Sequence, residues 1–437
     1  MVKVGKWIAR HRVLMLIVGF LLIIPSVIGM AKTRVNYDLL SYLPEHLETV
    51  KGQDILVDEY GMGAFSMVVV ENMDLKDVQK LEEKFENVSH VKDVLWYDDV
   101  ADISLPVEMI PSNLREAFFK GDATMMLVLF DNTTSSDEAM EAVTNMRAIA
   151  DKQCFISGMS GVVTDIKNLV MQEIPIYVTI AAVLSLIVLS LTMDSVVVPF
   201  LFLISIGMAI IYNLGSHVFF GEISYITKAL AAVLQLGVTM DYSIFLWHSY
   251  QEQKERFDGD KNRAMAHAIS NTITSVVSSS ITTVAGFIAL CFMSFTLGKD
   301  LGIVMAKGVV FGVIGCVTIL PSLILVCDKA IEKTRHKVIL PDLSRIAGFI
   351  TKHHVVFVIA FLVVLIPAIY GYTHTNVYYD LTGTLPETFS SKVGNDKLSE
   401  QYHMGATHMV LAKSSLSEKD SMNMIDEIKN FDMEVFL

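Results

Sequence analysis

VNYDLLSYLPEHLETVKGQDILVDEYGMGAFSMV, residues 35–68, recurs as VYYDLTGTLPETFSSKVGNDKLSEQYHMGATHMV at residues 377–410. The two stretches align without a gap at an offset of 342 positions, and 16 of their 34 positions are identical. Each follows an apolar segment, with Pro25 matched by Pro367. A duplication of this length is typical of membrane transporters built from two parallel halves. Because the second copy breaks off at Leu437, the sequence predicts a little more than half of a larger transporter.

The composition indicates a membrane protein. Hydrophobic residues make up 52% of the chain and the mean hydropathy is +0.49, more apolar than an ordinary soluble protein. A helix needs about 20 apolar residues to cross the hydrocarbon core of a bilayer. Seven segments meet this requirement and are predicted to span the membrane: Val13–Met30, Ile176–Met193, Val196–Phe219, Ile226–Trp247, Ile273–Phe295, Leu301–Val326 and Val355–Tyr372.

Basic residues predict the orientation of the chain. Lys and Arg cluster before the first span, after the fourth span, and between the sixth and seventh spans. By the positive-inside rule these three segments are cytoplasmic. We therefore expect a multi-pass protein of the cell membrane with a cytoplasmic N-terminus. The first span lacks an A-x-A cleavage site, which favours a retained anchor over a cleaved signal peptide.

The segment between the first two spans is predicted to be extracytoplasmic and to fold by itself. It holds 26 acidic and 12 basic residues, which indicates either a solvated acidic surface or a vestibule that attracts cations. Its hydrophobic pattern predicts a β-α-β-β-α-β order, the split ferredoxin-like unit. The six elements are Phe65–Glu71, Leu75–Asn87, Val91–Tyr97, Thr124–Phe130, Ser136–Ala150 and Cys154–Ser157.

The predicted fold class is an α-helical polytopic membrane protein of seven spans with an α/β ferredoxin-like extracytoplasmic domain of the porter type. Its predicted parts are an N-terminus with span 1 at 1–30, the extracytoplasmic domain at 31–173, spans 2–6 at 174–327, a basic cytoplasmic loop at 328–354, span 7 at 355–372, and the start of a second, truncated extracytoplasmic domain at 373–437. In that last part we expect strands at His408–Ala412 and Met433–Leu437 and a helix at Ser417–Asn430.

Asp241 is the leading candidate for a functional residue. It lies in span 4, within QLGVTMDYSIF, about 15 residues or roughly 20 Å from the outer end of the helix. A carboxylate at such depth costs about 2.5–3.5 kcal/mol on insertion scales. One interpretation is a proton carrier, with the hydroxyl of Tyr242 as a relay; the other is a neutral Asp that hydrogen-bonds a neighbouring helix.

Span 5 offers a polar lining for a proton path. Thr274, Ser275, Ser278 and Thr282 share one helical face, which either meets Asp241 or serves close helix packing. Gly286 in span 5 and Gly237 in span 4 both permit a close approach between helices.

Two further features lie outside this candidate site. Lys307 in span 6 lies about 10 Å deep, and we expect it to reach back to the outer interface. Residues Gln251–Ala268 have the pattern of an amphipathic helix on the inner membrane surface.

The order of spans and loops resembles the resistance–nodulation–division superfamily. The motif GVTMDY at 237–242 is similar to the G-x-x-x-D-Y of its MMPL-type branch, and YDLLSYLPE at 37–45 resembles the segment after the first span in those proteins. Spans 2–6 are also similar to a sterol-sensing domain. The resemblance implies proton-driven export of lipids or other hydrophobic compounds by antiport, with Asp241 and Tyr242 as the proton relay. It also implies a partner Asp-Tyr pair from the second half, at position 583, beyond this sequence.

Two classes of function follow. The first is a secondary transporter that handles a hydrophobic or lipid substrate and protons, together with the missing C-terminal half or a second copy. The second is a non-transporting sterol-sensing-type module that acts in regulation or assembly. The sequence has no nucleotide-binding P-loop, metal-ligand motif or nucleophile triad. We therefore expect that the protein is not an enzyme and binds no metal or cofactor. Its expected partners include membrane lipid but no nucleic acid.

Overall fold

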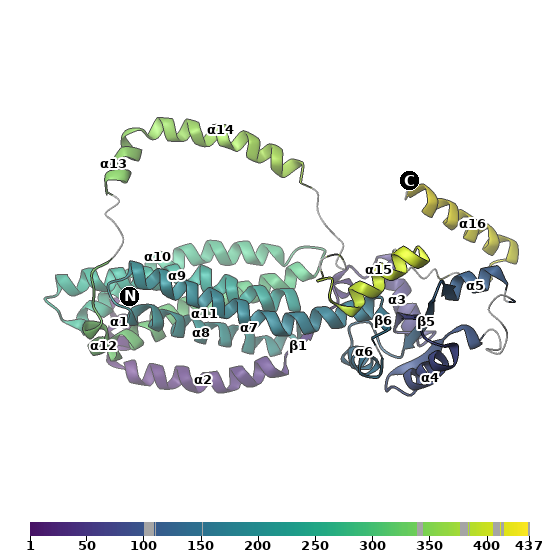
Figure 1. Cartoon of the computed structure of the whole chain (residues 1–437). Helices are drawn as coiled ribbons and strands as arrows, with labels where there is room; N and C mark the ends of the chain where they lie inside the picture. The colour runs from purple at the N-terminus through teal and green to yellow at the C-terminus, as the bar shows by residue number, and fades with distance from the viewer. Residues whose placement is uncertain are drawn as a thin grey trace. The chain divides into compact units, whose positions relative to one another are not determined.

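The structure is a computed structural model that describes residues 1–99, 109, 111–150, 152–338, 344–375, 383, 385–404, 411 and 415–435 (Figure 1). Contacts divide the chain into two compact units, each described by itself. The first, here called the bundle, comprises Met1–Glu45 and Val162–Pro386. The second, here called the sheet domain, comprises His46–Gly161 and Glu387–Leu437. The boundaries predicted from the sequence between membrane and outer parts stay predictions.

The chain is a helical polytopic membrane protein, because seven of the described helices are long and apolar enough to cross a membrane. They are α2 (Arg12–Lys32), α7 (Met159–Thr192), α8 (Val197–Gly215, continued by the 3-10 helix η4, Ser216–Phe220), α9 (Tyr225–Arg256), α10 (Lys261–Leu290), α11 (Leu297–Val326) and α14 (His354–Thr373). Shorter helices in the bundle are α1 (Val2–Arg10), α12 (Asp328–Lys333) and α13 (Ser344–Lys352). The predicted seven spans are confirmed.

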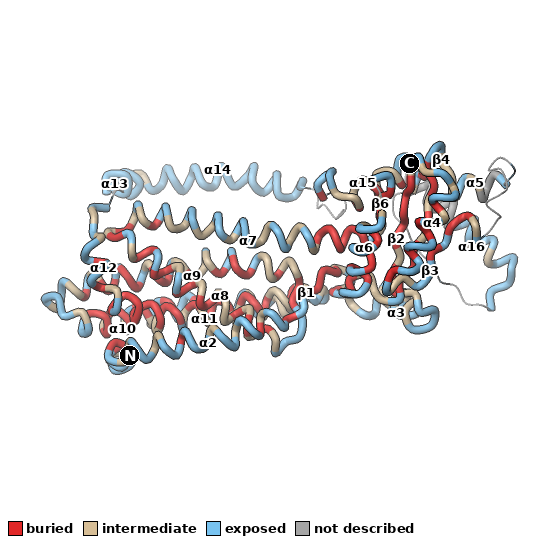
Figure 2. The backbone as a smooth tube through the Cα atoms, turned by 60° about the horizontal axis from the view of Figure 1, so that its bottom comes forward, coloured by how far each residue is buried: buried red, intermediate tan, exposed pale blue. Residues whose placement is uncertain are grey.

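Helices α8 and α11 form the centre of the bundle. Figure 2 shows buried residues gathered along both. Phe202 on α8, Leu246 on α9 and Leu320 on α11 belong to one apolar cluster that excludes solvent. Caps define where neighbouring helices begin: Ser224 Oγ accepts from Ile226 N at the start of α9, and Asp260 accepts from Arg263 N at the start of α10.

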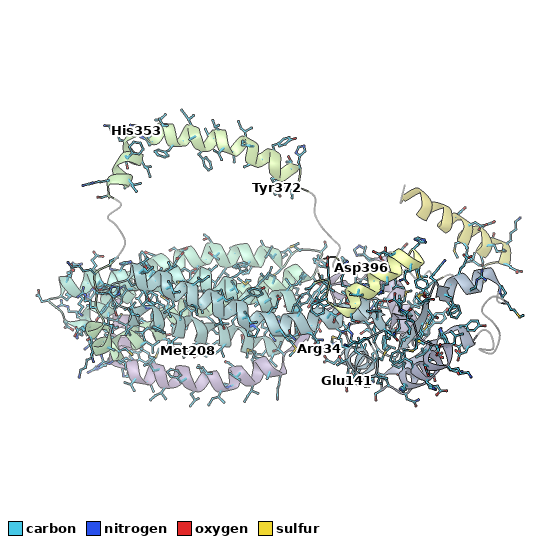
Figure 3. The ribbon with its side chains drawn as sticks, viewed as in Figure 1. Arg34, Glu141, Met208, His353, Tyr372 and Asp396 are labelled. Atoms are coloured by element: carbon cyan, nitrogen blue, oxygen red, sulfur yellow. The ribbon has the colours of Figure 1, made fainter. Side chains whose placement is uncertain are left out.

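The contacts within the bundle agree with spans that alternate in direction. At one end, Arg34 after span 1 pairs with Glu222 after span 3 (Nη1–Oε2 3.9 Å; Arg34 is labelled in Figure 3). At the other end, the Asp194 carboxylate before span 3 pairs with Arg335 after span 6 (3.1 Å). Each pair of contacting segments is separated by an even number of spans, as alternation requires.

A short segment after span 1 is fastened to one end of the bundle. Strand β1 (Arg34–Asn36) pairs in parallel with β7 (Glu222–Ser224), and the 3-10 helix η1 (Leu40–Tyr42) follows. Thr296 donates from both its N and its Oγ1 to Tyr42 O, at 2.9 and 3.0 Å. The segment that contains the repeated YDLLSYLPE sequence therefore connects span 1, through backbone hydrogen bonds, to the loops that follow spans 3 and 5.

The sheet domain has the predicted β-α-β-β-α-β order. Its antiparallel strands run β3-β5-β2-β6, and β4 pairs with β5 beyond this path. The elements are β2 (Ala64–Glu71), α4 (Leu75–Glu86), β3 (Val91–Leu95), the 3-10 helix η2 (Tyr97–Asp99), α5 (Ser112–Phe118), β4 (Phe119–Lys120), β5 (Ala123–Phe130), α6 (Asp137–Ile149) and β6 (Cys154–Ser157). Alternating apolar side chains on the strands pack against α4 and α6 in one core.

The opposite face of the sheet is covered by α15 (Ser390–Tyr402), which comes from the second copy of the repeat. Leu398 and Tyr402 pack with Met67 and Val69 of β2. Lys397 also pairs with Glu71 at 2.7 Å. This helix therefore belongs to the first sheet rather than to a unit of its own. A second, truncated domain at 373–437 stays a prediction.

The first copy of that helix, α3 (Glu48–Asp58), differs in its surroundings. Gly394, Leu398 and Tyr402 of α15 are buried. Their identical counterparts on the first copy are Gly52, Leu56 and Tyr60, and α3 buries none of its residues against the described chain. Tyr60 is 54% exposed whereas Tyr402 is 7% exposed. The same sequence pattern is thus buried against a sheet in one copy and only partly covered or exposed in the other.

Two local predictions were wrong. Residues 251–268 do not form one surface helix, because α9 continues to Arg256 and α10 begins at Lys261 after a turn with positive φ at Asp258 and Gly259. The predicted strand from Met433 is helical as far as Val435, since α16 spans Glu418–Val435. The helix expected at Ser417–Asn430 is present within α16. The strand expected at His408–Ala412 lies outside the described residues, apart from Leu411.

Candidate functional site

Asp241 lines a pocket of mixed polar and apolar side chains between α9 and α10. The pocket has a volume of about 460 Å³, and its polar side chains are Asp241, His248, Ser249, Glu252, Asn271 and Ser275. Asp241 is exposed, and no residue that the structure describes donates a hydrogen bond to its carboxylate. A carboxylate within a membrane span is costly unless it is paired, protonated or reached by water. The pocket leaves the Asp241 carboxylate accessible from outside the described chain.

Tyr242 points to the other side of α9. It is 7% exposed and lies in the apolar cluster of the bundle. Its backbone oxygen accepts from Cys316 Sγ of α11 at 3.3 Å. Consecutive residues of a helix differ by 100° in direction, so Asp241 faces the pocket while Tyr242 faces the core.

The structure brings one of the four predicted lining residues to Asp241. Ser275 lines the same pocket, and Asn271, one turn earlier on α10, does so too. Thr274, Ser278 and Thr282 are exposed, and their hydroxyls donate to the carbonyls of their own helix (Ser270 O, Thr274 O and Ser279 O). A role for these three in a proton path stays a prediction.

Gly237 and Gly286 do not contact another helix of the described bundle closely. A Cβ at either position would meet no atom within 4 Å, so neither is in close helix contact within the described chain. Close packing occurs at other glycines: a Cβ on Gly312 would strike Thr239, and one on Gly308 would strike Asn213 and Gln235. The sequence signal for this contact is G-x-x-x-G at 308–312, which marks close helix approach in membranes.

Lys307 reaches the end of α8, and its position relative to the outer membrane interface stays a prediction. Its Nζ donates to Asn213 O and Ser216 Oγ, both at 3.2 Å, and lies 3.5 Å from His217 Nδ1. The ammonium group is held there because the end of α8 offers it carbonyl and hydroxyl oxygens. Sequence reasoning missed His217 and Asn213, since a lone polar residue near the end of a span is a weak signal.

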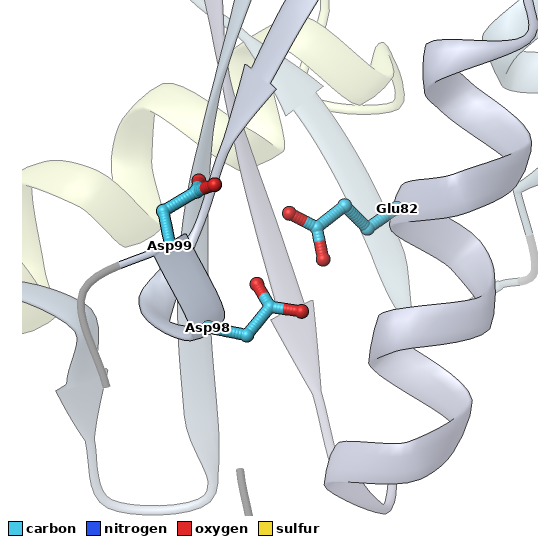
Figure 4. A group of neighbouring side chains, drawn as sticks. All are labelled: Glu82, Asp98 and Asp99. Atoms are coloured by element: carbon cyan, nitrogen blue, oxygen red, sulfur yellow. The ribbon is translucent and has the colours of Figure 1, made fainter. Parts of the chain in front are cut away.

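The sheet domain contains a group of three carboxyl groups that the sequence did not suggest. Glu82 of α4 faces Asp98 and Asp99 of η2, and one oxygen of each lies within 4.8 Å of the others (Figure 4). Asp98 accepts from Gln79 Nε2 at 3.1 Å and Asp99 from Trp96 N at 3.0 Å. Burial of Glu82, which is 5% exposed, and then the charge of Asp98 raise the pKa of Glu82 to about 8. A proton on Glu82 therefore relieves the repulsion within this group at neutral pH.

Comparison with known proteins gives one family match. The model of the MMPL family matches residues 71–351. Membrane protein YdfJ of Bacillus subtilis is 22% identical over 387 residues, which cover 83% of this chain and 50% of that protein. Membrane protein MJ1562 of Methanocaldococcus jannaschii is 25% identical over 260 residues, which cover 57% of this chain and 64% of that protein. The chain thus spans less than two thirds of the length of either relative.

Among solved structures, a crystal structure of SecDF in its super-membrane-facing form is similar to this chain. It aligns with a TM-score of 0.38 and 13% identity, over 74% of this chain and 38% of that chain.

Proposed function

Because this chain belongs to the MMPL family, we propose that it works within a two-repeat exporter that moves lipids or other hydrophobic compounds and is driven by protons. The single observation that carries the proposal is Asp241, an exposed carboxylate in the middle of a span, in a pocket that also holds His248, Glu252 and Asn271. Such a group can bind a proton from one side of the membrane and release it to the other. Asp241 is the proton carrier, and Tyr242 is its relay.

The open side of α9 and α10 is where the second half, or a second copy, would be expected to pack. Asp241, Ser275 and Ser278 are exposed there, together with apolar residues such as Phe245 and Ile281. Polar and small residues on one face favour association between helices in a bilayer. A covered Asp241 would exchange protons only when the two halves move apart.

The proposal predicts that Asp241→Asn abolishes proton-coupled export while the protein stays folded. Asn keeps the size and hydrogen-bonding capacity of the side chain but cannot titrate. Inverted membrane vesicles that contain the full transporter would be energised with a proton gradient, and export of a fluorescent lipid would be followed together with gradient dissipation. Asp258→Asn, at an exposed turn, is the matched control and should behave as the unchanged protein. Export and coupling that survive Asp241→Asn would leave Asp241 as a packing residue.

The alternative, a sterol-sensing-type module that regulates or assembles without transport, makes a different prediction for the same vesicles. Lipid binding should persist, no proton flux should accompany it, and Asp241→Asn should change neither. The pocket beside Asp241 supports transport, because it leaves room for a group that could exchange a proton with the carboxylate.

The proposed orientation, with the N-terminus in the cytoplasm, is tested by cysteine labelling. Single cysteines at Glu255 and Lys333, both exposed, should be protected from an impermeant reagent added outside intact cells. A cysteine at Glu138, exposed on α6, should react. The reverse pattern would invert the topology, and labelling at all three positions would contradict alternating spans.

A further inference from the structure

A second ionisable group lies in the bundle, at the end that carries β1 and β7. His217 of η4 is 2% exposed, and its ring lies between two residues of α11. Lys307 Nζ is 3.5 Å from Nδ1, and Asp300 Oδ1 is 3.5 Å from Nε2. Asp300 is held in place by Ser224 N, which donates to its Oδ2 at 2.9 Å. Three residues of different charge thus meet where spans 3, 4 and 6 end or begin.

The surroundings determine which ring nitrogen carries the proton. Nε2 is 2.9 Å from Glu222 O, a carbonyl that can only accept, so Nε2 donates. Nδ1 faces the Lys307 ammonium, which can only donate, so Nδ1 accepts. His217 is therefore neutral when Lys307 is charged. A second proton can bind to His217 only at Nδ1, which lies 3.5 Å from the Lys307 ammonium. Because two positive charges at that distance repel each other, protonation of Nδ1 favours the release of a proton from Lys307.

The other charged groups near His217 come from β7, β1 and η1. The Glu222 side chain accepts from Asn36 Nδ2 at 2.8 Å and pairs with Arg34, so its charge is shared with β1. Tyr42 of η1 lies close to the charges of Asp300 and Glu222. None of these groups comes between His217 and Lys307 in the described structure.

From Lys307 a line of buried polar groups runs inward along α9. Asn213, whose carbonyl accepts from Lys307, donates through Nδ2 to Gln235 Oε1 at 3.0 Å. Gln235 donates to Gly308 O at 3.1 Å, and Thr239 Oγ1 donates to Gln235 O at 2.6 Å. Asn213, Gln235 and Thr239 are each at most 2% exposed. Polar side chains buried in a membrane bundle are costly unless they are hydrogen-bonded, and they often mark an ion or proton pathway.

The buried polar groups continue along α9 toward Tyr242, the proposed proton relay. Gln235, Thr239 and Tyr242 follow i, i+4, i+7 spacing and so share one face of α9. At 1.5 Å per residue, Tyr242 lies roughly 10 Å further along the helix than Gln235. Asn213 Oδ1 is buried and accepts no hydrogen bond from the residues that the structure describes. Buried carbonyl oxygens of this kind are commonly satisfied by water, which is the usual carrier of a proton between side chains.

We propose that His217 and Lys307 load protons at the outer end of the bundle, and that Asn213, Gln235 and Thr239 hold the water that leads them to Tyr242 and Asp241. This inference rests on the proposed role of Asp241 as the proton carrier. A proton from outside forms an N–H bond at His217 Nδ1, and Lys307 releases one of its own to water beside Asn213. That proton ends on the Asp241 carboxylate. The Nδ1 proton then passes to the Lys307 amine, so one proton has moved from the outside to Asp241 and the pair of His217 and Lys307 is restored.

The two sides of α9 then have different roles. Tyr242 faces the buried polar line, whereas Asp241 faces the pocket with His248 and Glu252. Protons reach Asp241 from the outer end through the core and leave through the pocket toward the other end. His217 and Lys307 therefore determine that Asp241 receives its proton from the outer side of the membrane.

The test measures protonation of Asp241 directly. The full chain is placed in vesicles of fixed orientation, the pH on each side is set separately, and labelling of Asp241 by dicyclohexylcarbodiimide, which reacts with protonated carboxyl groups, is read by mass spectrometry. In the unchanged chain, labelling should rise when only the outer pH is lowered. His217→Gln and Lys307→Gln, which keep polar contacts but change titration, should each lose this response and keep the response to inner pH. His267→Gln on α10 is the matched control and should retain both.

Each outcome separates the two proposals. A response to outer pH that persists in both variants overturns the loading role of His217 and Lys307 but leaves Asp241 as carrier. Labelling of the unchanged chain that follows inner pH alone also overturns the loading role. Labelling that follows neither side overturns the proposed function as well. Thermal unfolding of every variant shows which are folded, and either of the two variants suffices for the decision.

Discussion

Gly215→Ala is expected to destabilise the helix bundle by about 1–3 kcal/mol, the usual cost of forcing an extra methyl group into a packed site. A Cβ at Gly215, the last residue of α8, would strike the backbone of Ser26 on α2. Backbone atoms cannot move aside as a flexible side chain can, so the two helices would have to separate. The hydrogen bond from Tyr212 Oη to Gly19 O at 2.6 Å, which joins the same helices, would be strained as well.

Gly207→Ala, in the same helix, is the matched control. A Cβ there would meet no atom within 4 Å. Because alanine favours a helix by up to about 1 kcal/mol over glycine, this variant should be unchanged or slightly more stable. Thermal unfolding of the purified chain in detergent gives both values. Equal midpoints for the two variants would mean that α2 and α8 do not approach as closely as described.

Glu82→Gln is expected to remove a pH dependence from the stability of the sheet domain. Folding raises the pKa of Glu82 from 4.5 to about 8, first through burial and second through the charge of Asp98. Between these values the folded chain holds a proton that the unfolded chain has released. The free energy of unfolding therefore falls as pH rises, by at most about 1.4 kcal/mol per pH unit from this group. The contribution is complete below pH 4.5 and is lost as the pH rises through about 8.

The measurement is urea unfolding of the sheet domain at pH 5 and at pH 8. At each urea concentration, the unfolded fraction is read from amide hydrogen exchange in β2 during a short pulse, and the pulse has the same pH in both series. In Glu82→Gln the stability difference between the two pH values should shrink, because Gln carries no charge at either. Glu83→Gln on the same helix, whose side chain is exposed, should leave the difference as it was. If both variants retain the original difference, the proton is held elsewhere in the domain.

The fold was largely predictable because its elements have strong periodic signals. The strands at 64–71 and 123–130 and the helices α4 and α6 were located within a few residues, since apolar alternation and the Ser136 cap are local features. Helix α5, in the loop marked by Pro106 and Pro111, was not predicted. The seven spans followed from length and hydropathy. A long-range contact could not be predicted in this way. Nothing local in Ser390–Tyr402 indicates that this helix packs on a strand more than 300 residues earlier in the chain.

The candidate site was predictable only in part. Asp241 attracted attention because a charge within an apolar span is rare, and Ser275 because hydroxyl groups repeat along one face. His217, Lys307 and Gln235 come together from three different spans, so their association depends on helix packing that periodicity does not specify. Likewise, Gly237 resembled a packing residue, but the contact with Thr239 is made by Gly312.

The position of α15 in the sequence has a consequence for biosynthesis. The sheet that it covers is complete at Ser157, but α15 begins only at Ser390, after six membrane spans have been made. At about 5–20 residues per second, the intervening 232 residues take roughly 10–50 s to translate. Throughout that time the apolar face formed by Met67 and Val69 lacks its partner. The newly made domain therefore exposes this apolar face to aggregation and to chaperones until α14 has been inserted and α15 has been made.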